Sequence, residues 1–286
     1  MVDRVATEMD DAGLSFGHGT DNAHDEAVWL VLWRLGLPLD DLDGVAEREL
    51  SASEINAIQD LIRQRITTRK PAAYLTQEAW LQGLSFFVDE RVIVPRSMIA
   101  EPMLDGGLGA CLPTPPRRVL DLCTGNASLA VLAALTWPDA AVDASDLSAD
   151  ALAVAAINLE RHAVQARVRL LQADGLTGLT GPYDLILCNP PYVNADAMAA
   201  LPAEYRAEPA LALAGGSDGM DFVRAFLRDA PTVLAPTGSL LLEIGHERAH
   251  FEAAFPHLSP LWLSCSAGDD HLLLLGAAEL HPFETP

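Results

Sequence analysis

The chain has 286 residues, half of them hydrophobic, and a formal net charge of −22 from 40 acidic and 18 basic side chains. This length allows one large domain or two smaller ones, and the apolar content is sufficient for a buried core. The charge disfavours direct nucleic-acid binding, which rests largely on Lys and Arg contacts, and would attract a basic macromolecule, although composition alone favours a simpler role in solubility.

The sequence lacks the signals of membrane insertion and export. No apolar run reaches the ~18 residues of a membrane-spanning helix, and the acidic start MVDRVATEMDD is unlike a secretory signal peptide. We therefore expect a cytoplasmic protein. The four cysteines are far apart, at positions 111, 123, 188 and 265. Neither a metal site nor a disulfide framework is expected, and the cysteines should be reduced and buried.

The N-terminal part has the pattern of helices. Apolar residues recur through residues 21–38 until Gly36 and Pro38 stop the pattern. A second helix is expected to begin at Ser51, which has capping-box spacing to Glu54, and to end at Pro71.

The pattern then changes to alternation. Apolar residues alternate on both sides of an Asp-Glu-Arg turn, which predicts a β-hairpin at Leu84–Val94. Residues 97–107 favour a helix that Pro102 would break or kink. The stretch CLPTPPRR, residues 111–118, is typical of a linker.

From residue 118 onward, strands alternate with helices. Strands are expected at Arg118–Leu122, Ala141–Ser145, Val168–Leu171, Tyr183–Cys188 and Ser239–Ile244, and helices at Ser128–Leu135, Ser148–His162 and Asp221–Leu234. A closing hairpin is expected from Leu261–Cys265 and His271–Leu275. This order predicts an α/β fold with a doubly wound, mostly parallel sheet and an antiparallel strand at one edge.

Open α/β sheets bind ligands at the carboxyl ends of their strands. Small residues follow the first strand in Asp121–Ala127, which would let a ligand approach the backbone. Asp146 follows the second strand and could accept hydrogen bonds from a ribose diol. Asp174 follows the third strand and could accept one from an exocyclic amine such as that of adenine.

Each of these signals is weak alone, because Asp146 or Ser148 could simply cap a helix. A nicotinamide cofactor is the competing interpretation, but it needs a loop that cradles pyrophosphate, and GNASLA is a poor match. The three signals on consecutive strands, followed by Asn-Pro-Pro-Tyr (NPPY, residues 189–192) after the fourth, form a more specific set.

The series DLCTGNASLA, VDASDLS, QADGL and NPPY resembles the class I S-adenosylmethionine-dependent methyltransferases. Residues 71–101, PAAYLTQEAWLQGLSFFVDERVIVPRSMIAE, resemble the HemK/PrmB group of protein glutamine methyltransferases. The residues from NPPY to GGSDGMD resemble its ribosomal-protein branch, which acts on large-subunit ribosomal protein L-three. The resemblance begins near Glu54.

The resemblance implies a Rossmann-like class I methyltransferase sheet with a small N-terminal helical domain and a linking β-hairpin. We expect residues 1–82 to form a helical substrate-recognition domain, 83–96 the hairpin linker, and 97–286 the methyltransferase domain. The implied cofactor is S-adenosylmethionine, with S-adenosylhomocysteine as product.

The resemblance also implies site residues. The cofactor would be bound by Asp121, Cys123, Thr124, Gly125, Asn126, Asp146, Leu147, Asp174, Gly175 and Asn189. The catalytic residues would be Asn189, Pro190 and Tyr192, and substrate would contact these with Pro191, Arg96 and Glu101. Arg96 and Glu101, like the further charges at Glu204, Arg206 and Glu208, could line the site or instead hold its loop by ion pairs.

A carboxamide nitrogen is a poor nucleophile because its lone pair is delocalised. The resemblance implies that the Asn189 side-chain oxygen and the Pro190 carbonyl accept the two hydrogens of the substrate amide and position its nitrogen. Successive prolines fix φ and lack N–H donors, so the carbonyls can be aimed rigidly. Tyr192 would pack against the planar amide and exclude water.

The sequence departs from the family pattern at three places. Asn126 and Ala127 stand where the usual loop reads CTGSG, Gln77 stands where glycine is usual, and Pro102 lies within a predicted helix. A methyl group at position 127 would crowd the cofactor or require a small shift.

The leading hypothesis is methylation of a glutamine in a basic ribosomal protein. The nearest alternative substrate is the GGQ loop of a peptide-chain release factor. NPPY also serves enzymes that methylate adenine amines in DNA or RNA, which the charge of −22 disfavours. A non-enzymatic alternative is a cofactor-binding relic whose loop Ala127 has weakened.

Overall fold

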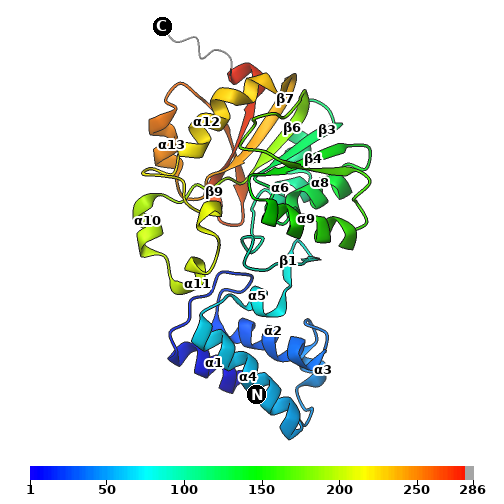
Figure 1. The fold of residues 1–286 in the computed structure, drawn as a ribbon, viewed down its shortest axis with the longest axis vertical. Helices are drawn as coiled ribbons and strands as arrows, with labels where there is room; N and C mark the ends of the chain where they lie inside the picture. Colours follow the sequence, from blue (N-terminus) through cyan, green and yellow to red (C-terminus); the bar gives the residue numbers. More distant parts are fainter. Residues whose placement is uncertain (281–286) are drawn as a thin grey trace.

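The computed structural model describes residues 1–280. A bundle of helices lies at one end of the molecule and a large sheet at the other (Figure 1). The bundle contains α1 (Val2–Asp11), α2 (Ala23–Leu35), α3 (Leu42–Val45), α4 (Ala52–Thr68) and α5 (Ala72–Thr76). Its core includes Val5, Met9, Leu30, Ile58 and Ile62.

The predicted start and stop signals of these helices are confirmed. Ser51 and Glu54 form a complete capping box at α4, and Gly36 ends α2 in the left-handed conformation that favours glycine. Helix α4 ends before Pro71, which instead begins α5. Helix α1 was not predicted, although Val5 and Met9 have helical spacing and are buried.

The hairpin lies earlier in the chain than predicted. Strand β1 (Ala79–Leu81) pairs with β2 (Leu84–Phe86), and Gln82 and Gly83 form the turn with positive φ. Two such residues are what a two-residue hairpin turn favours. The predicted second strand at residues 92–94 is wrong: Val92 and Val94 are buried in the helical core without a strand partner.

Within residues 1–280, seven strands form the large sheet in the order β5-β4-β3-β6-β7-β9-β8. Their bounds are β3 (Arg118–Leu122), β4 (Ala141–Asp146), β5 (Val168–Gln172), β6 (Tyr183–Cys188), β7 (Leu234–Glu243), β8 (Leu261–Cys265) and β9 (Gly268–Gly276). The first five are parallel, and β9 pairs antiparallel with β7 and β8. The α/β fold, with its closing antiparallel hairpin, is confirmed.

Two apolar cores cover the two faces of the sheet. One contains α8 (Ser128–Thr136) and α9 (Ala149–Arg161), and the other contains α12 (Asp221–Asp229) and α13 (Arg248–Ala254). The helix predicted to run to Leu234 ends at Asp229 because a short 3-10 turn, η2 (Ala230–Thr232), leads directly into β7. A final 3-10 turn, η3 (Ala277–Glu279), follows β9.

The single helix predicted at residues 97–107 is two short helices, α6 (Ala100–Leu104) and α7 (Gly107–Cys111). Pro102 lies in the first turn of α6, where the missing N–H has no helical partner to lose. It therefore causes no kink.

Two further expectations can be compared with the described residues. No helix among them is long and apolar enough to cross a membrane. All four cysteines are free, but only Cys188 is buried and Cys111 is exposed, so the expectation of four buried thiols is wrong.

Candidate active site

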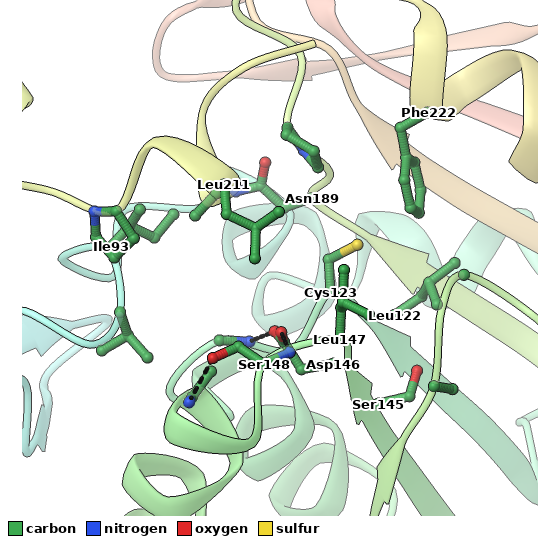
Figure 2. Close-up of a pocket in the computed structure, with 18 of the residues that line it drawn as sticks. Ile93, Leu122, Cys123, Ser145, Asp146, Leu147, Ser148, Asn189, Leu211 and Phe222 are labelled. Atoms are coloured by element: carbon green, nitrogen blue, oxygen red, sulfur yellow. Dashed lines mark hydrogen bonds between the residues drawn. The ribbon is translucent and has the colours of Figure 1, made fainter.

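A pocket opens at the carboxyl ends of β3, β4, β5 and β6, where the order of the strands reverses. The strand ends, the loops that follow them and the first turn of α9 contribute Leu122, Cys123, Gly125, Ser145, Asp146, Leu147, Ser148, Ala151, Ala173, Asp174, Gly175, Asn189 and Pro191. Figure 2 shows Asn189 and Leu211 on the upper side of the pocket and Asp146 and Ser148 on the lower side. This is the ligand-binding position expected for an open α/β sheet.

Asp146 organises the floor of the pocket. Its Oδ2 accepts a hydrogen bond from the backbone N–H of Gly125 at 2.9 Å, and its Oδ1 accepts one from Ser148 at 2.9 Å (Figure 2). Burial raises the pKa of this carboxyl, while the backbone donors oppose the rise. Each oxygen retains further acceptor capacity toward the pocket. Ser148 also caps α9, so the helix-capping interpretation and the ligand-binding one are compatible.

Asp121 lies beneath the glycine loop and does not line the pocket. Its carboxylate accepts hydrogen bonds from the Thr124 hydroxyl and, at 2.9 Å, from the backbone N–H of Ala130. Burial raises the pKa of Asp121 to about 7. Asp121 therefore shapes the loop between β3 and α8 from below, and any effect on a ligand is indirect.

Asp121→Asn is expected to change how the free energy of unfolding depends on pH. In the folded chain Asp121 keeps its proton up to pH about 7, whereas in the unfolded chain it ionises near pH ~4. The stability that the raised pKa of Asp121 contributes is therefore fully present below pH ~4. It is lost as the pH rises to about 7, by up to ~1.4 kcal/mol per pH unit. Urea titrations of both proteins from about pH 4.5 to about pH 8 cover this window. Wild type should lose stability relative to the variant as the pH rises to about 7, and the difference in free energy of unfolding should then stay constant. A constant difference would contradict the assignment.

The loop that departs from the family pattern is strained but packed. Ala127 has φ +65°, in the left-handed region, and is fully buried in the sheet core. It does not line the pocket, so its methyl group does not crowd a ligand there. The Asn126 Oδ1 accepts from Ser128, and the Asn126 carbonyl accepts from Asn158, which also bonds both backbone groups of Phe87.

Ala127→Gly is expected to be nearly neutral, whereas Ala133→Gly in the middle of α8 should be destabilising. At position 127, relief of a left-handed strain of about 1–2 kcal/mol offsets the lost methyl burial of ~0.8 kcal/mol and the greater freedom of unfolded glycine. At position 133, also fully buried, both losses remain, for a total of about 1.5–2 kcal/mol. Chemical denaturation measures both; equal losses would show that Ala127 is unstrained.

Only two of the four NPPY residues line the pocket. Asn189 and Pro191 line the pocket, whereas Pro190 is buried and Tyr192 lies outside it. Within residues 1–280, no hydrogen bond occupies the Asn189 carboxamide, which leaves it available to a ligand. The Tyr192 hydroxyl lies 3.4 Å from Oε1 of Glu243, and its ring packs on Gly245, where a Cβ would come within 2.6 Å.

The residues after NPPY fold back beneath it. They form α10 (Ala195–Ala200), α11 (Ala203–Arg206) and the turn η1 (Ala210–Ala212) before a two-residue parallel bridge between Val193 and Ala214. Gly219 then packs against the Tyr192 carbonyl, which a Cβ at this position would approach to 2.2 Å. The glycines of GGSDG therefore allow the close backbone contact that supports NPPY.

Arg96 and Glu208 connect the loop that follows NPPY to the segment between β2 and α6. The guanidinium binds the carboxylate through two hydrogen bonds of 2.7 Å, and Glu208 also accepts from the backbone N–H of Val94 at 2.9 Å. His18 lies 3.5 Å away. Burial alone would raise the pKa of Glu208, but its contacts with His18 and Arg96 outweigh it and lower the pKa to about 2. Arg96, expected to contact substrate, is thus occupied by Glu208.

Glu204 connects the same loop to the helical bundle. Its buried Oε1 lies 2.7 Å from Nε of Arg69 and 3.4 Å from Nη1 of Arg65, and accepts from the backbone N–H of Ser15. Arg65 is itself fully buried and lies 2.7 Å from Glu26 on α2. Of the two roles that the sequence allows for Glu204, the structure shows an ion pair in this interhelical network. Arg206 is exposed and donates to the Leu201 carbonyl.

Glu101 lies away from the pocket. Its carboxylate accepts hydrogen bonds of 2.6 Å from both the backbone N–H and the hydroxyl of Ser266, in the turn between β8 and β9. Two groups of residues that line the pocket were not predicted from the sequence. The linker contributes Arg91, Val92 and Ile93, and the later loop and α12 contribute Pro209, Leu211, Ala212 and Phe222.

Comparison with known proteins identifies the family. The family model of the methyltransferase small domain matches residues 105–204. The ribosomal protein uL3 glutamine methyltransferase of Bordetella pertussis is 52% identical over 284 residues, which cover 98% of this chain and 95% of the relative. The chain belongs to the ribosomal protein uL3 glutamine methyltransferase family. It is therefore a methyltransferase, as the resemblance implied.

A second relative and a solved structure are also similar to this chain. The uL3 glutamine methyltransferase of Burkholderia pseudomallei is 51% identical and covers 98% of this chain and 94% of its own length. The hMettl16 catalytic domain, solved with an RNA hairpin, is 16% identical with a TM-score of 0.51, covering 79% of this chain and 81% of that one. At that identity the likeness concerns the methyltransferase fold alone.

Proposed function

We propose that this chain transfers a methyl group from S-adenosylmethionine to the side-chain nitrogen of a glutamine in ribosomal protein uL3. The observation that carries the proposal is the free Asn189 carboxamide, which lines a pocket that also contains Asp146 and Asp174. The names of the relatives in this family support uL3 as the substrate.

The pocket residues fit this cofactor. A Cβ built at Gly125 or Gly175 would meet no atom within 4 Å, so both glycines border open space. Leu147, 48% exposed, and Phe222 provide apolar surface for a base. The Asp146 and Asp174 carboxylates could accept hydrogen bonds from the ribose hydroxyls and the base amine.

When bound, the cofactor would supply an electrophilic methyl group. The Asn189 oxygen and the Pro190 carbonyl are proposed to accept the two hydrogens of the substrate carboxamide, which orients its nitrogen toward that methyl group. These acceptors also favour the positive charge that develops on the nitrogen. The methylated nitrogen becomes acidic and loses its proton afterward, so no strong general base is needed.

Tyr192 is proposed to act through its position. Burial raises its pKa, as does the nearby Glu243 carboxylate, so its hydroxyl stays protonated. Its place between Gly245 and Glu243 supports a packing role that keeps Asn189 and the prolines in place.

A methyl-transfer assay tests the proposal. Free uL3, a release factor and protein-free RNA would be incubated side by side with enzyme and labelled S-adenosylmethionine, and products mapped by mass spectrometry. We expect one methylated glutamine in uL3 alone. Methylation of the release factor at its GGQ loop would replace uL3 by the alternative substrate, and the absence of any labelled glutamine would overturn the proposal.

A further inference from the structure

A second cavity lies on the helical bundle, outside the pocket described above. Three of the chain's five tryptophans, Trp29, Trp33 and Trp80, line this groove together with Pro38 and Leu39. Trp29 and Trp33 are four residues apart on α2 and so share a face. Trp80 comes from β1, which lies above α2 and α5 in Figure 1. We call this cavity the tryptophan groove.

Trp80 is exposed by the way its hairpin is built. Along β1, Ala79 and Leu81 point into the protein and Trp80 points outward, leaving 48% of its surface exposed. An indole so exposed is costly in water and is typical of a surface that contacts another molecule. Aromatic anchors of this kind dominate binding energy at protein interfaces.

The groove has a single sign of charge. Among the described residues that line it, the charged ones are Asp40 and Glu78, both carboxylates, and none is basic. Indole faces attract the cationic heads of lysine and arginine, and nearby carboxylates pair with them. Apolar walls also cover the long methylene stems of these side chains. The matching ligand is therefore a lysine- or arginine-bearing polypeptide segment.

We propose that the tryptophan groove binds a basic segment of the protein substrate, away from the glutamine that is methylated. This inference rests on the proposed function. The hairpin that carries Trp80 continues into Arg91, Val92 and Ile93, which form a wall of the pocket. One substrate chain could thus contact Trp80 in the groove and residues 91–93 at the pocket. The net negative charge of the enzyme would favour the approach of a basic substrate.

Steady-state kinetics with two substrates test this binding. Trp80→Ala and the double variant Asp40→Asn/Glu78→Gln would be assayed on full-length uL3 and on a short peptide containing only the glutamine and its neighbours. We expect KM for uL3 to rise about 10-fold in each, with kcat and the peptide kinetics unchanged. Raising the salt concentration should reduce the difference in KM for uL3 between wild type and the double variant, because salt screens the charge pairs that the double variant removes.

The matched control is Leu261→Ala, which removes another exposed apolar side chain, 52% exposed on β8. It should leave both substrates unaffected. If wild type methylates uL3 but the groove variants keep its KM, the groove assignment is overturned and the function stands. If wild type does not methylate uL3, the proposed function fails, and calorimetry of uL3 binding then tests the groove assignment by itself. Weaker binding of uL3 by Trp80→Ala supports the groove assignment. Equal binding by both proteins, or no binding by wild type, overturns it.

Discussion

Replacement of Asn189 by alanine is expected to lower kcat about 100-fold or more, with little change in stability. The side chain lies partly exposed in the pocket and bonds to no other side chain among the described residues, so its removal leaves no buried group unpaired. Its loss removes an acceptor that would hold the substrate amide and favour the charge on its nitrogen. Loss of one such preorganised hydrogen bond typically costs about 10²–10³ in rate.

Single-turnover methylation of uL3 with saturating cofactor measures this effect, and thermal unfolding checks the fold. Asn56→Ala is the matched control, because Asn56 is exposed on α4, far along the chain from the pocket. It should retain wild-type kcat. Near-normal turnover by Asn189→Ala would remove Asn189 from the catalytic centre and with it the proposed role of NPPY.

Replacement of Arg65 by methionine is expected to lower the free energy of unfolding by about 3–5 kcal/mol. Methionine fills a similar volume, but Glu26 and Glu204 each lose a cationic partner in a site where all three side chains are at most 2% exposed. Glu204 keeps Arg69 at 2.7 Å, but Glu26 is left as an uncompensated buried charge. Removing one partner of a buried ion pair has a cost of this order. Burial already raises the pKa of Glu26, so protonation at lower pH should reduce the deficit.

Arg63→Met on the same helix provides the comparison. Arg63 is 68% exposed and pairs with Asp60, itself 65% exposed, at 2.8 Å. Exposed pairs contribute little, and the loss should stay below about 0.5 kcal/mol. Urea titrations of the two variants measure both effects. Similar small losses would mean that the buried network is not a source of stability.

Local patterns were sufficient for much of the fold. The apolar runs of β3, β4 and β6 and the capping signals of α4 and α9 could be identified from neighbouring residues alone. The same holds for Asp146, Asp174 and Asn189, because residues that follow parallel strands must meet at one edge of the sheet. They line the pocket together with five other predicted site residues, Cys123, Gly125, Leu147, Gly175 and Pro191.

The other predictions depended on which distant residues meet. Asp121 is acidic and follows the strand pattern, yet it turns under the loop toward Ala130. Arg96 and Glu101 have charges suited to a substrate, but their partners, Glu208 and Ser266, lie more than a hundred residues away in sequence. Such pairings leave no periodic signal along the chain. The hairpin was misplaced for a related reason, since Val92 and Val94 alternate to fill a core and have no strand partner.

The contact between Arg65 and Glu204 also has a consequence for synthesis of the chain. The two residues are 139 positions apart, so ribosomes adding about 5–20 residues per second need roughly 7–28 s to make the second after the first. During that interval the nascent helical bundle has an arginine with only Glu26 to neutralise it. The bundle should therefore reach full resistance to proteolysis only after the loop that follows NPPY has emerged.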